Sequence, residues 1–447
     1  MLERLDLDRI FASARHKGFG SCEIYCETTT QSLIQFSGKS EDTRFHGHSG
    51  VGLRLDNGRA SRFLKTTEMT TQAILKLLGE EADGCTQETF MPESTEKPKA
   101  DQTLTAEKRA SRLSQWCKEI LCDERKILQP CLRYDDKIQT FEMVNSMGQT
   151  GKGQEQTAQM VVRWAVESKE TEQPFHARIS RTSINSFFEA LDNNPIESQI
   201  RRSLKNTKWP VPCAHLPVLW MPTALSKIML PFIRAFEGDL VLHNLSFLTD
   251  YQFPIPLSFS IVDLATGDNF PTDHEGSPRR AMVLFDEGRP RGLTCNIHIA
   301  EQLNVKSTGH CRRESFACPP TIGVWTPSIQ SSETEHALEQ NMERGLCIHD
   351  VEVTHFDPAT TMLRLICPDT ELVHHGELGE SVQTFELEIG LLDLLRSLKT
   401  FSKQQSIIGH AIAKSNQRLF CDMTVPQAFS ESLPIPGTVP ASHYWQI

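Results

Sequence analysis

Apolar residues recur at helical spacing in four stretches of the first half of the chain. They repeat three and four positions apart over residues 7–14, 74–78, 106–121 and 183–191, and each stretch is predicted to form a helix with one apolar face. Gly18 closely follows the first stretch, and glycine commonly ends a helix. The first half therefore contains several helices that need an apolar surface to cover.

Extended patterns lie between these helices. Apolar and polar residues alternate over residues 22–26, and residues 32–36 are rich in β-forming types before Ser37-Gly38, so two strands are predicted to pair there. A second pair is predicted over residues 50–55 and 59–65, because the Asn-Gly step between them supplies the positive φ angles of a tight hairpin. Further strands are predicted over residues 127–134, 140–145 and 158–166.

The second half of the chain has a different pattern. A polar stretch with two prolines, residues 205–213, is predicted to separate two domains, residues 1–209 and residues 210–447. After it come many short extended stretches with turn residues between them, and two helices near residues 224–236 and 391–398. The order of elements predicts an α+β fold, with an N-terminal mixed α+β domain and a C-terminal, mainly antiparallel β domain with a few helices. The strands predicted in the second half are residues 218–220, 258–264, 281–286, 292–297, 350–353, 362–367 and 385–389.

Composition narrows the classes of function. The 447 residues include 46 Lys and Arg against 57 Asp and Glu, a net charge of −11, which does not suit a surface that binds nucleic acid or anionic lipid. The most apolar stretch, residues 216–233, is broken by Lys227 and three prolines, whereas a membrane-spanning helix needs about 20 nearly uninterrupted apolar residues. The first residues alternate charge with leucine, unlike a secretory signal. We therefore expect a cytoplasmic protein with neither a membrane nor a nucleic-acid partner.

Two short clusters carry residue types that are used in catalysis. His274-Glu275 is the only His-Glu dipeptide in the chain, and it runs into a Gly-Ser-Pro sequence that cannot continue a helix. Cys311 is flanked by His310 and by two arginines, which would lower the pKa of an exposed thiol. Either these four residues form a site, or they are a loop carboxylate, solvated histidines and a structural thiol. The 13 cysteines include no Cys-x-x-Cys pair, which indicates reduced thiols rather than a disulfide framework or a structural zinc site.

A series of short segments is spread in order over nearly the whole chain. In this order and spacing the segments resemble the TldD/PmbA family, known as modulators of DNA gyrase and as a two-subunit metallopeptidase. The resemblance implies an N-terminal α+β domain followed by a C-terminal antiparallel β domain that forms an open barrel or sandwich. The segments are residues 50–59 (GVGLRLDNGR) with 66–67 (TT), 145–148 (NSMG), 261–263 (IVD), 273–276 (DHEG) with 279–280 (RR), 286–288 (DEG), 307–309 (STG) with 312–313 (RR), and 390–395 (GLLDLL).

The resemblance also indicates where a metal site would lie. The catalytic branch of the family carries His-Glu-x-x-x-His at the start of the second domain, shortly before an acidic Glu-Gly-Asp stretch, and a distal cysteine in a Cys-Gly-Lys context. Counting back from residues 237–239 (EGD), the three motif positions fall on Met229, Leu230 and Arg234, and the C-terminal region has Cys421 followed by Asp-Met. These residues supply neither two imidazoles nor a carboxylate, and an arginine repels a metal ion. The resemblance therefore points to the non-catalytic, TldE/PmbA-like branch, with no metal in this chain.

The function implied is that of a metal-free subunit of a cytoplasmic heteromeric peptidase. Its partner would be a TldD-like paralogue with the His-Glu-x-x-x-His motif, which would carry the zinc. Strand addition to an exposed sheet edge would hold an unfolded peptide substrate through backbone hydrogen bonds. Two alternatives stay open. One is a peptidase active on its own through a site rebuilt from His274, Glu275, His310 and Cys311, and the other is a homodimeric peptide-binding or regulatory protein without a protease partner.

Overall fold

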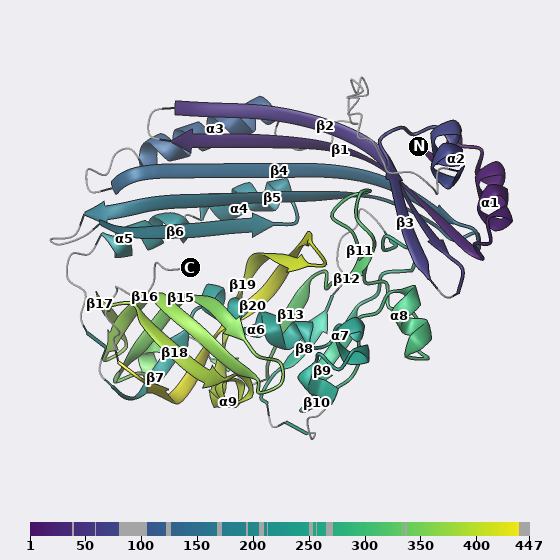
Figure 1. Ribbon diagram of the computed structural model, residues 1–447. Helices are drawn as coiled ribbons and strands as arrows, with labels where there is room; N and C mark the ends of the chain where they lie inside the picture. Colours follow the sequence, from purple (N-terminus) through teal and green to yellow (C-terminus); the bar gives the residue numbers. More distant parts are fainter. Residues whose placement is uncertain are drawn as a thin grey trace.

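The computed structural model shows two large sheets, one built before residue 182 and the other after residue 213 (Figure 1). Residues 92–102 are polar and rich in Pro and Lys, which predicts a loop, but they lie outside the described residues. Most of the boundary predicted over residues 205–213 also lies outside them, and the division into two domains stays a prediction. The structure describes residues 1–37, 40–58, 60–79, 105–121, 127–167, 172–193, 195–204, 210–211, 213–249, 254–255, 257–264, 271–332, 334–335 and 338–437.

The N-terminal sheet has six antiparallel strands in the order β3-β2-β1-β4-β5-β6. Apolar side chains of α3, α4 and α5, among them Leu113, Phe187 and Ile200, pack on one face of it against Tyr134 and Met160. The other face is turned toward the C-terminal half. The strands are β1 (Ser21–Ser37), β2 (Ser40–Asp56), β3 (Ser61–Thr66), β4 (Ile127–Asn145), β5 (Thr150–Glu167) and β6 (Glu172–Arg181), and the helices are α1 (Leu7–His16), α2 (Thr71–Gly79), α3 (Ala106–Ile120), α4 (Ile184–Asp192) and α5 (Pro195–Ser203).

The sequence predicted the helices of this half better than its strands. The four predicted helices and the Asn-Gly hairpin between β2 and β3 are confirmed, with Gly58 at φ +79°. The separate strands predicted over residues 22–26 and 32–36 are wrong, because β1 is one strand paired along its whole length with β2. Polar residues interrupt the alternation in the middle of β1, but Glu27 and Thr29 are buried and hydrogen-bonded to each other. β4 likewise joins two predicted strands.

The C-terminal sheet has 12 strands and is mainly antiparallel. Its main path is β10-β9-β8-β13-β20-β7-β15-β16-β17, while β18 pairs with β16, and β19 with β14 and β20. Three pairs are parallel: β7 with β15, β13 with β20, and β14 with β19. The strands are β7 (Ala214–Trp220), β8 (Ser260–Asp263), β9 (Met282–Asp286), β10 (Arg289–Pro290), β13 (Pro327–Gln330), β14 (Thr334–Glu335), β15 (Arg344–Phe356), β16 (Met362–His374), β17 (Glu377–Ser381), β18 (Phe385–Gly390), β19 (Leu398–Lys414) and β20 (Gln417–Ile435).

The α+β fold class predicted from the sequence is confirmed, with the parallel pairs as an addition. The strand predicted over residues 292–297 is wrong. Asn296 there caps α8, since its side chain accepts the N–H of Ile299, and this ends the extended conformation. None of the helices within the described ranges combines the length and the apolar character needed to cross a membrane. The helices of this half are α6 (Pro222–Arg234), α7 (Gly238–Leu242), α8 (Ile297–Gln302) and α9 (Leu391–Ser397), and β11 (Cys311–Arg312) pairs with β12 (Thr321–Ile322) in a separate small sheet.

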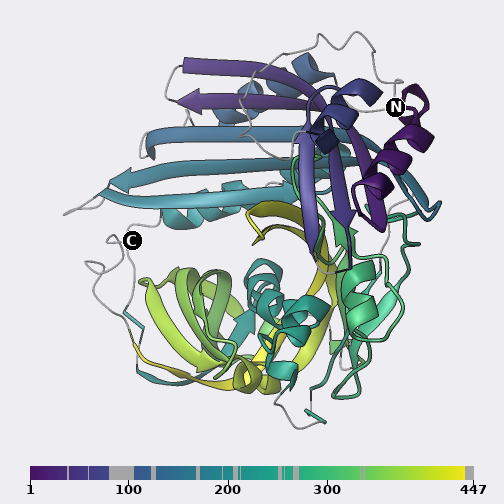
Figure 2. The same ribbon diagram turned by 45° about the vertical axis from the view of Figure 1, so that its right-hand side comes forward.

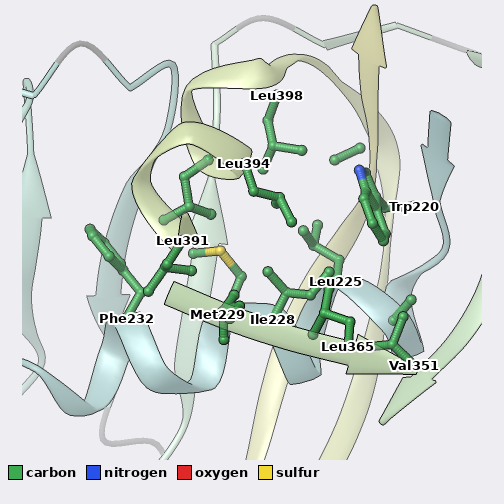
Figure 3. Close-up of a cluster of buried hydrophobic side chains, with 14 of the residues drawn as sticks. Trp220, Leu225, Ile228, Met229, Phe232, Val351, Leu365, Leu391, Leu394 and Leu398 are labelled. Carbon is green, nitrogen blue, oxygen red and sulfur yellow. The ribbon is translucent and has the colours of Figure 1, made fainter. Parts of the chain in front are cut away.

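Helix α6 lies at the centre of the C-terminal core. Figure 3 shows Leu225, Ile228 and Phe232 of this helix among side chains of α9 and of the sheet. Pro231 is tolerated inside the helix, which continues to Arg234. The inner side of α6 is therefore fixed by packing, and only its outer side is available for other contacts.

One contact between the two halves lies where the segment around β11 and β12 reaches the N-terminal sheet, as Figures 1 and 2 show, and β6 contacts β19 and β20 in another. Phe316 and Trp325 of this segment pack against Tyr25 and its neighbours on the inner face of the sheet. The contact needs glycine on β2. A Cβ on Gly52 would lie 2.4 Å from the carbonyl oxygen of Phe316, so the backbone can approach this closely only without a side chain.

Candidate functional site

The three residues predicted to stand at the positions of the family's metal motif lie together on α6, but their surroundings are apolar. Met229 has no exposed surface and belongs to the core in Figure 3. Leu230 packs on the same core, and Arg234 is the last residue of the helix, with its side chain 31% exposed. No imidazole or carboxylate is present at these positions, so the residues do not fit a zinc ion. In the described ranges, no group of three or more His, Cys, Asp or Glu side chains is placed to hold a metal.

The distal cysteine position is also apolar in character. Cys421 is fully buried in β20 and belongs to the same core as α6. Burial raises the pKa of its thiol to about 12, so the sulfur is protonated at neutral pH. A metal ligand would have to be a thiolate. Cys421 therefore behaves as a small apolar residue of the core.

A pocket of about 550 Å³ opens on the outer side of α6. Leu230 and Arg234, two of the three motif positions, line it, while Met229 points into the core. The end of β15 supplies Val353 and Phe356 to the opposite wall. The remaining wall is formed by the segment after α7, including residues 245–247. The accessible surface at the motif positions is thus an apolar pocket with cationic groups at its edge.

The candidate residue His274 lies at the contact between the two halves. Its Nε2 is 3.0 Å from Oε1 of Glu155 on β5, and its Nδ1 accepts the N–H of Arg313 at 2.9 Å. The Nδ1 lone pair is therefore used, and the ring is the Nε2–H tautomer that donates to Glu155. Burial lowers the pKa of His274, which favours this neutral form. Both ring nitrogens serve to connect segments of the protein.

Glu275 and the preceding aspartate fix the loop that carries His274. The carboxylate of Glu275 pairs with Arg54 of β2 and accepts the N–H of Ile297 at 2.9 Å. Asp273 accepts backbone N–H groups of Glu275, Ser277 and Cys311 at 2.8–3.0 Å. Burial, with the charge of Glu275 next, raises the pKa of Asp273 to about 7. The carboxylates therefore hold backbone and do not face solvent.

His310 and Cys311 are equally enclosed. Nε2 of His310 lies 3.2 Å from Oδ2 of Asp263, and its Nδ1 lies 2.9 Å from the carbonyl oxygen of Thr308. Cys311 is fully buried, and burial, aided by the nearby carboxylates of Glu275 and Asp273, raises the pKa of its thiol well above the usual range. The flanking arginines were expected to lower the pKa of the thiol only if it were exposed. Cys311 is buried, so they do not activate it.

These four candidates belong to one buried network, which we call the buried joint. It consists of the loop at residues 273–277, residues 310–313 and their partners in the N-terminal sheet. Arg313 pairs with Glu23 of β1, and Glu23 also accepts Nη2 of Arg54 at 2.8 Å. The sequence analysis did not identify Glu23, Arg54 and Glu155 as parts of this network. The only indication in the sequence is that each is a charged residue at an alternating position of a strand. The structure thus brings the four candidate residues near one another, but in a contact that holds segments of the protein together. None of the four has exposed surface.

The sequence of the C-terminal half matches a known protein family. Residues 214–431 match the family model of the PmbA/TldA metallopeptidase C-terminal domain. This part of the chain belongs to the PmbA/TldD family. The family resemblance of the sequence is thereby confirmed. No curated protein is recognisably similar in a search with the whole sequence.

Solved structures share this fold over nearly the whole chain. TldE from Thermococcus kodakarensis superimposes with a TM-score of 0.77 at 13% identity, covering 97% of this chain and 100% of that one. A proposed modulator of a DNA gyrase from Thermotoga maritima gives 0.73 at 17% identity, covering 97% and 99%. A proposed modulator of DNA gyrase from Bacteroides thetaiotaomicron gives 0.71 at 14% identity, covering 96% and 97%. At such identities the likeness concerns the fold alone.

The segments that resemble the PmbA/TldD family have identifiable structural roles in this chain. The glycine at residue 52 allows the close contact with Phe316. Residues 273–276 and 312–313 are part of the buried joint. Glu237 and Asp239, at the acidic stretch after α6, both pair with Lys414 of β19 at 2.8 Å. These segments therefore maintain the fold in this chain, and the predicted metal-motif positions hold Met229, Leu230 and Arg234.

Proposed function

We propose that this chain is a TldE-like, non-catalytic subunit of a cytoplasmic two-subunit metallopeptidase. A TldD-like paralogue with an intact His-Glu-x-x-x-His motif would bind the zinc. The observation that carries the proposal is the side-chain chemistry of α6. Met229, Leu230 and Arg234 occupy the motif positions, and the buried thioether, the isobutyl group and the guanidinium cannot replace two histidines and a general base.

The proposed substrate is an unfolded peptide or a small labile protein. Extended chains bind to sheet edges through backbone hydrogen bonds, which require no particular sequence. The N-terminal sheet ends in β3 on one side and β6 on the other, and the main path of the C-terminal sheet ends in β10 and β17. Strand addition at one of these edges would present a peptide to the partner's metal.

The test compares the isolated chain with the complex. The chain is purified alone and together with a co-encoded paralogue that carries the motif, and bound zinc and cleavage of an unstructured peptide are measured. We expect zinc and cleavage only in the complex, and loss of cleavage when the paralogue's motif glutamate is replaced by glutamine. Stoichiometric zinc and cleavage in the isolated chain would instead establish an independent peptidase. Failure to bind any such paralogue would support the homodimeric peptide-binding alternative.

A further inference from the structure

The pocket on the outer side of α6 combines an apolar interior with cations at its edge. Leu230, Phe247, Val353 and Phe356 supply the apolar surface, and Leu245 at its margin is 58% exposed. A volume of about 550 Å³ lies within the usual range of ligand pockets, roughly 300–1,000 Å³. An occupant that removes this apolar surface from water would be stabilised by the hydrophobic effect, and exposed apolar surface of this kind marks binding sites.

Arg234 gives the pocket its electrostatic character. Within the described residues its charged partner is Glu237, at 3.5 Å from Nε, and Nε itself is buried without a hydrogen bond. The second oxygen of this carboxylate, Oε2, accepts from Lys414 at 2.8 Å, so Glu237 is shared between two cations. A guanidinium carries five N–H donors, and Arg234 shares the carboxylate of Glu237 with Lys414, so its Nη groups have hydrogen-bonding capacity for an anion that enters the pocket. Lys227, also at the pocket, pairs with Asp350 and adds a second cation nearby.

From these observations we infer that the pocket binds the carboxyl-terminal residue of an extended peptide. The apolar side chain of that residue fills the space between Leu230 and Phe356, and its α-carboxylate accepts hydrogen bonds from the guanidinium of Arg234. Arginine suits this task because its planar N–H groups match the two oxygens of a carboxylate. The inference extends the proposed function by giving the subunit a defined peptide-binding site. It concerns this chain alone and needs neither zinc nor a partner.

Binding is measured on the isolated full-length chain by fluorescence anisotropy. The probes are an unstructured octapeptide labelled at its N-terminus and ending in leucine, and the same peptide with a C-terminal amide. We expect the amide to bind roughly tenfold more weakly, since it lacks the charge-assisted hydrogen bonds. Equal affinity for the acid and the amide would overturn the inference, and this comparison depends on no variant.

Variants then locate the effect. Arg234→Gln is expected to reduce binding of the acid to that of the amide and to leave the amide unchanged, and Leu245→Asp is expected to weaken binding of the acid by placing a like charge at the margin. Arg291→Gln is the matched control, because Arg291 is also a partly exposed arginine paired with a nearby glutamate, Glu287. An Arg291→Gln variant as weak as Arg234→Gln would refute the assignment. So would binding of dodecanoate, a simple fatty acid, by a chain that does not bind the peptide. Failure of the zinc and partner assay would leave these measurements unaffected.

Discussion

The outer side of α6 and the buried joint differ in both their side-chain chemistry and their exposure to solvent. The joint contains two histidines, a cysteine and several carboxylates, but His274, Glu275, His310 and Cys311 have no exposed surface. The α6 pocket is open, but the residues at the metal-motif positions are apolar or cationic. Catalytic residue types and accessible surface are therefore separated in this protein. Residue types alone do not identify a site, because buried polar groups can equally serve to join segments.

The largest effect is expected from breaking the joint. Glu23→Ala leaves the buried guanidinium of Arg313 without its carboxylate and also removes a partner of Arg54. Removing one member of a buried ion pair typically costs about 3–5 kcal/mol, and we expect a loss of this size in the free energy of unfolding. Urea denaturation measures it.

Glu388→Ala is the matched control for this variant. Glu388 pairs with Arg364 on the surface, where both side chains are more than half exposed, and such pairs contribute about 0–1 kcal/mol. If both variants lose the same stability, the joint does not hold the two halves together.

A smaller effect is expected at the close contact of β2 with the segment that follows β11. Gly52→Ala would place a Cβ 2.4 Å from the carbonyl oxygen of Phe316, and the backbone must move to relieve it. Overpacking of this kind costs about 1–3 kcal/mol. Gly47→Ala on the same strand is the control, because the nearest atom to its Cβ is 3.8 Å away. Thermal unfolding of the two variants should differ, and equal melting temperatures would contradict this account of the contact.

His410, which lies near Lys227 of α6, and His274, which lies in the joint, should differ in how they change the free energy of unfolding with pH. Burial, with Lys227 and Arg181 adding to it, lowers the pKa of His410 to about 3, whereas Glu155 opposes the lowering for His274. Between pH 6.5 and 3 the unfolded chain therefore binds a proton at residue 410 that the native state does not. Stability is then lost as the pH falls through this range, at up to about 1.4 kcal/mol per pH unit.

Unfolding by urea at pH 7, 6 and 5 tests this dependence. His410→Leu is expected to flatten the loss of stability at low pH more than His274→Gln does, because His274 has a carboxylate partner. A steeper pH dependence in His410→Leu than in the unchanged chain would show that the sign of this argument is wrong.

The sequence determines the local elements of this protein better than its long-range contacts. The helices and the Asn-Gly hairpin were predictable, because their periodicity and turn residues lie within a few positions. β1 was divided in the prediction because its buried middle is polar, and only the contact with the C-terminal half explains that burial. The joint could not be predicted from local sequence patterns for the same reason, because its members Arg313 and Glu23 are 290 positions apart in the chain. The α6 positions could be located by family resemblance, but not the pocket, whose walls come from three separate segments.

The smallest effect on stability is expected at Arg234, the last residue of α6, in contrast to Met229 in the core of the same helix. Arg234→Gln should change the free energy of unfolding by less than about 1 kcal/mol, because the guanidinium is partly exposed and Glu237 keeps Lys414 as a partner. Met229→Ala, five residues earlier, should cost about 2–5 kcal/mol because it opens a cavity in the core. A near-neutral Arg234→Gln that still loses discrimination between peptide acid and amide would separate binding from folding at this position. A large loss of stability in Arg234→Gln would instead make the arginine part of the scaffold, like the residues of the joint.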